Sequence, residues 1–285
     1  MYRILVFFTT AFFLIAINAF TQEDKFWVER SNENSQILLN ILAKASPETA
    51  GEIGMSGLDE EIRDLKPGFE ERVMKMLEDA KSELRKKLQA EKHPAVQQDL
   101  EILITSAQMN IVEINLEEKH ILPYYNVSGI VYRGIRSLLD EQVAPERRKA
   151  SLVRLKKYAG VEKGYTPISR LAKSHLQEHL DQPELMAPVK EEIERNLANS
   201  PRFMAELKEL FNSYGIEDYK SAFRSLEKQV QAYDDFVKME LLPRARTDFQ
   251  LPKELYEFRL KNRYGVDMSV DVLTKRAKTE FKELQ

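Results

Sequence analysis

A helical repeat of apolar residues constrains the fold of this chain more than any other feature of its sequence. In the segment "PGFEERVMKMLEDAKSELRKKLQAEKH" (67–93), apolar side chains recur every three or four residues, the spacing that places them on one face of an α-helix. The stripe consists of Phe69, Val73, Met76, Leu77, Ala80, Leu84 and Leu88. This segment is therefore predicted to be a long amphipathic helix.

The following segment repeats the pattern and predicts a second long helix. Its apolar stripe is Val96, Leu100, Leu103, Ala107, Ile111 and Ile114. Lys92-His93-Pro94 separates the two stripes, and a proline disfavours helix at the residue before it. The two helices are expected to form an antiparallel hairpin.

Helix signals continue through the rest of the chain. The Thr-Pro pair at 166–167 and the Ser-Pro pair at 200–201 each predict a helix start, and Asp218 precedes an apolar stripe (219–241) that ends before Pro243. Glycines expected to adopt a left-handed conformation at helix ends are Gly160, Gly164 and Gly215. Because no segment shows sustained period-two alternation, we predict an all-α fold, a multi-helix array of long antiparallel helices with an N-terminal signal helix.

Three stretches lack a helical pattern. "ASPETAGEIGMSG" (45–57) is small, polar and rich in glycine, so we expect a loop before a short helix. "HILPYYNVSG" (120–129) is expected to break the chain after the hairpin, and "LPRARTDFQLP" (242–252) to be an extended segment bounded by prolines.

The N-terminus has the construction of a secretory signal peptide. Arg3 precedes an apolar run from Ile4 to Ile17, and a cleavage site after Ala19 would follow small residues. The run is shorter than the roughly 20 apolar residues of a membrane-spanning anchor, which is the alternative. We therefore predict a signal peptide at 1–19 and a helical domain at 20–285. The sequence has no cysteine, so we expect a periplasmic or extracellular protein of a bacterial envelope, with no stable membrane anchor after cleavage.

Composition argues against nucleic acid as a partner. The formal net charge is −3, from 43 Lys+Arg and 46 Asp+Glu, so no global field attracts an anionic polymer. The basic run "RRKASLVRLKK" (147–157) interleaves leucine and valine with its charges, as a solvated helix face does.

Two histidines raise the question of a metal site. His175 and His179 bracket Glu178 in a His-x-x-Glu-His pattern, and residues four apart on a helix could both reach one zinc ion with Glu178 as a base. Both also lie in or beside an apolar helical stripe, where histidines are usually packed and hydrogen-bonded. No third ligand stands out among the many acidic residues. We therefore predict no metal ligand and no catalytic residue here.

The extended segment 242–252 holds the candidate binding residues. Arg244, Arg246 and Asp248 lie between two prolines, and fixed arginine forks can contact a substrate or another part of a protein. The alternative is a structural ion-pair clasp between helical layers.

Four strings in this chain resemble one family. They are "ASPETAGEIGMSGLDEEIRDL" (45–65), "RLKKYAGVEKGYTPISRLA" (154–172), "LLPRARTDFQLPKELYEFRLKNRYGVDM" (241–268) and "RAKTEFKELQ" (276–285). In this order they are similar to the bacterial proteins classed as domain of unknown function 885, of which the Pro-Arg-Ala-Arg-Thr-Asp-Phe string is the most specific. The resemblance implies a largely helical, often exported protein that looks like a zinc-dependent peptidase of the gluzincin type.

The metal motif of that family has no counterpart in this chain. The resemblance implies a His-Glu-x-x-Pro-Gly-His string in the C-terminal half of the family, with two zinc ligands and a glutamate that activates water. No His-Glu pair occurs in these 285 residues. We therefore expect the N-terminal half of such a protein, with no cofactor of its own, part of the substrate cleft, and zinc only in a C-terminal half beyond Gln285. The alternative is a shortened relative, a complete exported binding module for a peptide or protein partner.

Overall fold

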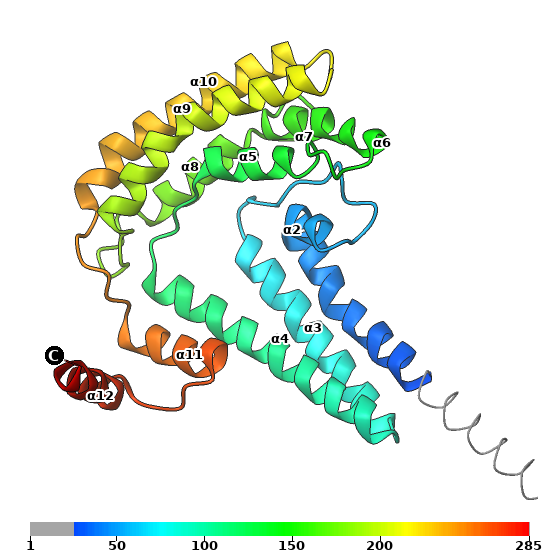
Figure 1. Cartoon of the computed structure of the whole chain (residues 1–285), viewed down its shortest axis with the longest axis vertical. Helices are drawn as coiled ribbons and strands as arrows, with labels where there is room; N and C mark the ends of the chain where they lie inside the picture. The colour runs from blue at the N-terminus through cyan, green and yellow to red at the C-terminus, as the bar shows by residue number, and fades with distance from the viewer. Residues whose placement is uncertain (1–25, 285) are drawn as a thin grey trace, which may run out of the picture. The chain divides into compact units, whose positions relative to one another are not determined.

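The computed structural model describes residues 26–284, and within this range every regular element is helical (Figure 1). Two isolated β-bridges, Ile121 with Met186 and Val189 with Arg246, are the only extended pairings in the described range. The all-α prediction is confirmed. The predicted signal peptide, 1–19, lies outside the described residues.

The chain divides into two compact units. Of the described residues, unit 1 comprises 26–41 and Val73–Ile111, and unit 2 comprises Leu42–Arg72 and 112–284. None of the helices within 26–284 is long and apolar enough to cross a membrane.

Unit 1 contains most of the predicted hairpin, whereas the first turn of its first helix and the end of its second, from Val112 on, belong to unit 2. Helices α3 (Phe69–Ala90) and α4 (Pro94–His120) are separated by three residues, and a helix over 26–45 precedes them. Leu84, Val96 and Leu100 form the buried centre of this unit. At the turn, the Glu91 carboxylate accepts hydrogen bonds from the backbone N–H groups of residues 92 and 93 (both 2.8 Å), so the hairpin closes where the sequence predicted.

Unit 2 contains the remaining helices and the larger core. They are α2 (Pro47–Glu52), α5 (Val127–Arg136), α6 (Pro145–Arg148), α7 (Ala150–Tyr158), α8 (Ile168–His179), α9 (Lys190–Ser213), α10 (Lys220–Phe236), α11 (Lys253–Tyr264) and α12 (Val270–Glu283). Helix α9 packs on α5, and α10 packs on α7 and α8 (Figure 1). The stripe predicted at 219–241 supplies much of the core, including Phe223, Leu226 and Val230.

Two local predictions were wrong. Residues 47–52, expected in a loop, form α2, because Pro47 starts a helical turn that buries Glu48 and Ala50. The helix start expected at 200–201 does not occur: α9 runs through Pro201 without a break. Buried Ile193, Met204, Leu207 and Phe211 lie on both sides of that proline, and we infer that their shared burial outweighs the one backbone hydrogen bond that proline removes.

The helix boundaries after residue 160 depend on left-handed glycines, as predicted. Gly160 has φ +64°, and an added Cβ would lie 2.4 Å from the ring of Pro167, so both the backbone angle and the space require glycine. Helix α8 begins one residue later than its Thr-Pro signal suggested. Helix α10 continues as a π-helical turn, Val237–Leu241, and a 3₁₀ turn, Leu242–Arg244, before the irregular segment 245–252.

Candidate functional site

The predicted binding segment is held by its own arginines. The Arg246 guanidinium donates to the carbonyl oxygens of Ala187 (2.9 Å), Asp248 (2.8 Å) and Gln250 (2.8 Å), and to the Asp248 carboxylate (3.0 Å). The backbone of Arg246 also pairs with Pro188 and Lys190 in the second β-bridge. Its side chain is 17% exposed, so its donors are largely committed to fixing the loop.

Arg244 and Asp248 are more accessible. Arg244 donates to the carbonyl oxygen of Leu180 at 2.6 Å but is otherwise exposed, and the Asp248 side chain is 61% exposed. These contacts are of the kind expected for a structural clasp. A role of Arg244, Arg246 and Asp248 in substrate or partner binding stays a prediction, with Arg244 and Asp248 the more accessible of the three.

The basic run 147–157 makes ion pairs and hydrogen bonds with the loop that follows α2. Arg147 makes two 2.8 Å hydrogen bonds to the Asp59 carboxylate, and this pairing lowers the pKa of Asp59 below its usual value. Lys157 pairs with Glu61 at 3.0 Å. The expectation of a solvated helix face was therefore wrong for Lys157, which is buried, whereas Arg147 is exposed and pairs with Asp59 at the surface.

Arg154 lies at the centre of these contacts and is 1% exposed. Its guanidinium donates to the carbonyl oxygens of Glu61 (3.0 Å), Leu58 (3.0 Å) and Gly134 (2.6 Å). Nearby, the Tyr158 hydroxyl donates to the Glu48 carboxylate at 2.6 Å, and burial raises the pKa of Tyr158 well above its usual value. We call Arg154, Tyr158, Glu48 and their partners the Arg154 network.

A second group of ionisable side chains brings three separate parts of unit 2 together. Glu70 and Glu71 lie in the first turn of α3, Glu118 near the end of α4, and His175 and His179 on α8. Oxygen atoms of the three glutamates lie within 4.8 Å of one another, and the imidazole rings are 5.2 Å apart. We call these five residues the carboxylate–histidine cluster.

Tyr125 connects the two halves of this cluster. Its hydroxyl donates to the Glu70 carboxylate at 3.3 Å and lies 3.3 Å from Nδ1 of His175. Nε2 of the same histidine is 3.9 Å from the Glu70 carboxylate. On α8, Nδ1 of His179 lies 2.8 Å from the carbonyl oxygen of His175, and a carbonyl can only accept, so Nδ1 carries the proton.

The cluster carries excess negative charge. Burial raises the pKa of Glu118 above its usual value, Glu70 and Glu71 raise it further, and His179 opposes the rise. Within residues 26–284, no lysine or arginine forms an ion pair with Glu71 or Glu118. Two carboxylates about 5 Å apart repel by ~1 kcal/mol in water and by more where protein replaces water.

The sequence indicated only half of this cluster. It singled out the histidine pair but offered no third ligand, because Glu70 and Glu118 are 48 positions apart in a chain with 46 acidic residues. A usable signal was present in part: Glu70-Glu71 opens one hairpin helix and Glu118 closes the other, so an antiparallel hairpin brings both ends together.

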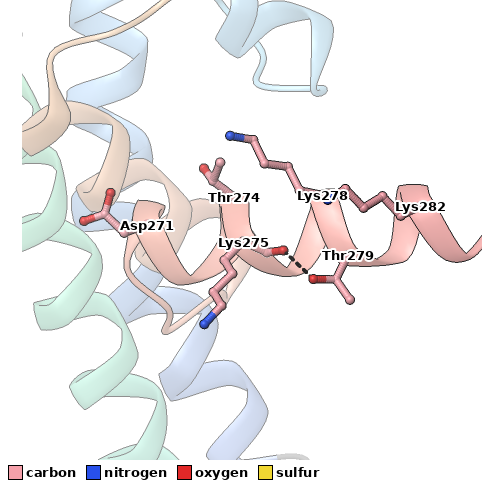
Figure 2. Close-up of a pocket in the computed structure, with 6 residues that line it drawn as sticks. All are labelled: Asp271, Thr274, Lys275, Lys278, Thr279 and Lys282. Atoms are coloured by element: carbon pink, nitrogen blue, oxygen red, sulfur yellow. Dashed lines mark hydrogen bonds between the residues drawn. The ribbon is translucent and has the colours of Figure 1, made fainter.

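Helix α12 presents a different surface. None of its residues is buried, and Phe281 and Val272 are 63% and 54% exposed. Figure 2 shows a shallow polar pocket along this helix, lined by Asp271, Thr274, Lys275, Lys278, Thr279 and Lys282. A second pocket adds apolar side chains, with Tyr256 of α11 beside Leu273, Ala277 and Phe281.

Comparison with known proteins identifies one family for this chain. The family model described as a bacterial protein of unknown function (DUF885) matches residues 47–285. Because the match covers most of the chain, this protein belongs to that family. No curated protein and no solved structure matched in the same comparisons.

Proposed function

We propose that this chain is the non-catalytic N-terminal helical portion of an exported zinc-metallopeptidase-like protein and forms part of its substrate cleft. The observation that carries the proposal is the apolar stripe of α12. Leu273, Ala277 and Phe281 lie on one side of a helix with no buried residue. A stripe of this kind normally packs on another element.

Membership in the family supports the same proposal. The resemblance implies that the reactive zinc lies in a His-Glu-x-x-Pro-Gly-His string, and this chain has no His-Glu pair. The catalytic partner would then be a polypeptide that carries this string and packs on α12. The segment with Arg244 and Asp248 would contact that partner or a peptide-like substrate, with no nucleic acid involved.

The purified chain should not hydrolyse a peptide substrate by itself. The test is a fluorescent casein assay with added zinc, with and without a chelator. Chelator-sensitive turnover by the chain alone would refute the proposal.

The genomic locus tests the second part of the proposal. An in-frame continuation beyond codon 285 that encodes His-Glu-x-x-Pro-Gly-His would supply the partner. Co-expressed with that polypeptide, the chain should co-purify with it, and Phe281→Glu should weaken the complex. Phe26→Glu, at a phenylalanine that is 63% exposed outside both α12 and the segment 242–252, is the matched control.

A stop codon at this position would favour the alternative, an exported helical module that binds a peptide or protein without enzymatic activity. Its apolar docking surface would be the same stripe of α12. In that case Phe281→Glu should abolish capture of the partner by the isolated chain, and a co-expressed metallopeptidase polypeptide should not co-purify.

A further inference from the structure

Two independent features of unit 2 have the chemistry of a cation site. One is a set of three carboxylates, Glu70, Glu71 and Glu118, without an arginine or lysine counter-ion for Glu71 or Glu118 in the described part of the chain. The other is the histidine pair on α8, whose four-residue spacing stacks two imidazoles one turn apart. The hairpin ends and α8 contribute these features separately, and the fold brings them together.

The hydrogen bonds leave imidazole nitrogens suited to a metal. Nδ1–H of His179 is committed to the carbonyl oxygen of His175, so in the neutral ring Nε2 holds the free lone pair. Metal-binding histidines typically donate their second nitrogen to a carbonyl or carboxylate in this way.

His175 has a related arrangement. Its Nδ1 faces the Tyr125 hydroxyl, which donates its only proton to Glu70 and can therefore accept from this nitrogen. Nε2 then faces the Glu70 carboxylate at 3.9 Å, an arrangement that either a proton on Nε2 or a cation between the two groups would satisfy.

We infer that the carboxylate–histidine cluster binds one divalent transition-metal ion of the zinc class. His175 and His179 would supply nitrogen ligands through Nε2, and Glu70 and Glu118 would supply oxygen ligands. Mixed imidazole and carboxylate sets suit zinc and its neighbours, whereas magnesium and calcium prefer oxygen alone. Glu71 adds negative charge beside the ion.

The ligands must close on the ion when it binds. Zinc binds nitrogen and oxygen at about 2.0–2.2 Å, so ligand atoms around one ion lie roughly 3–3.5 Å apart. His175 Nε2 and the Glu70 carboxylate, at 3.9 Å, are already near this separation, whereas the three carboxylates are up to 4.8 Å apart and neither histidine belongs to that group. Glu118 is exposed, so its side chain can rotate towards the imidazoles when an ion binds.

This site goes beyond the proposed function. The metal motif expected of the family lies in another polypeptide segment, whereas this ion would join the start of α3, the end of α4 and α8. Its role would be to stabilise this part of unit 2, so binding should raise the melting temperature of the chain.

The test is zinc titration of the tag-free chain after chelator treatment and dialysis. Isothermal calorimetry should give one zinc per chain, and Co²⁺ should give visible absorption bands from nitrogen and oxygen ligands. His179→Ala and Glu118→Gln should each weaken zinc binding by about tenfold or more. Glu178→Gln, an exposed residue of the same helix, should leave the affinity unchanged.

Three outcomes would overturn the inference. They are no saturable binding by the unmodified chain, an affinity in both cluster variants equal to that of the unmodified chain, or a weakening by Glu178→Gln as large as that in the cluster variants, which would place the ion on the exposed motif alone. Metal-free melting curves establish that each variant folds, and His179→Gln replaces His179→Ala if the latter does not. None of these results depends on peptidase activity, so they are independent of the proposed function.

Discussion

The Arg154 network and the carboxylate–histidine cluster are both assembled from ionisable side chains far apart in the sequence, but they differ in how charge is balanced. In the network, one buried guanidinium serves three carbonyl oxygens, and the buried Glu48 carboxylate accepts from Tyr158 and from the backbone of Arg63. In the cluster, three carboxylates lie close together with two imidazoles and one hydroxyl.

This difference separates a structural group from a candidate ligand-binding group. Burying a charge is tolerated when its hydrogen-bonding partners are supplied by the fold, as they are for the Arg154 guanidinium and for Oε1 of Glu48. Oε2 of Glu48 is buried without a hydrogen bond, and its nearest positive charge is Arg63 at 4.0 Å. A set of like charges without a counter-ion is stabilised when a cation or proton arrives. The comparison therefore predicts that substitutions in the two regions change stability in opposite directions.

The largest effect is expected for Arg154→Met. The methionine removes three hydrogen bonds from a buried guanidinium, to the carbonyl oxygens of Leu58, Glu61 and Gly134, so the free energy of unfolding should fall by about 3–5 kcal/mol. Urea denaturation followed by circular dichroism measures this loss. Arg170→Met, at an exposed position of α8, is the control and should change stability little.

A loss below about 1 kcal/mol for Arg154→Met would contradict the assignment of a structural role. Fluorescence of Trp27, the single tryptophan, follows unit 1 separately. It therefore tells whether the loss is confined to unit 2.

Tyr158→Phe should have a smaller effect in the same direction. It removes one hydroxyl from a fully buried ring and deprives the Glu48 carboxylate of its 2.6 Å donor, for an expected loss of about 1–3 kcal/mol. The measurement is the urea concentration at the midpoint of unfolding, with the dependence of the unfolding free energy on urea concentration unchanged. Tyr264→Phe, at a ring that is 74% exposed, should leave the midpoint unchanged, and an equal midpoint for both variants would count against the network.

Asp234 lies outside both regions and tests the same idea: a carboxylate whose charge the fold does not fully balance should destabilise the folded protein. Burial raises its pKa to about 6, while a hydrogen bond from Ser200 and the charge of Lys238 oppose the rise. The folded state therefore favours the protonated carboxyl. Between about pH 4, where the unfolded carboxyl ionises, and about pH 6, stability falls as pH rises, and above pH 6 the full penalty remains.

Asp234→Asn should remove this penalty. The gain should be about 1 kcal/mol at pH 7.5, because partial exposure reduces the full effect of the shift, and should vanish below about pH 4. Thermal melts across this range provide the measurement. A gain that stays the same at pH 4 would show that charge is not its cause.

The smallest effect is expected for Glu118→Gln in the metal-free chain. Removing one of three neighbouring carboxylates should raise stability by less than about 1 kcal/mol, since Glu118 is exposed. Differential scanning calorimetry with and without a chelator gives the comparison, with Glu178→Gln as the neutral control. A clear loss of stability without metal would mean that the cluster is balanced like the Arg154 network.

Much of the fold was predictable because it depends on local periodicity. The hairpin, the break at 91–93, the stripe at 219–241 and the left-handed glycines all follow from patterns within a few turns of helix. Family membership was also readable, from strings such as Pro-Arg-Ala-Arg-Thr-Asp-Phe.

Two of the wrong predictions share one cause. Pro201 reads locally as a helix start, but the same core buries the apolar residues on both sides of it, so the helix continues. Arg154 reads as part of a solvated basic face, but the loop after α2 and Gly134 of α5 provide carbonyl oxygens around it. In both cases a distant segment outweighs the local pattern.

By itself, the sequence determined the all-α class, the position of most long helices and the family to which the chain belongs, because backbone preferences and apolar spacing act over short distances. The tertiary structure alone decided which charges meet. Glu70 and Glu118 became neighbours of His175 because the hairpin returns the chain to its starting point, and Arg154 became buried because a loop nearly a hundred residues earlier covers it. Electrostatic interactions depend on distance in space, which is known only once the helices are packed.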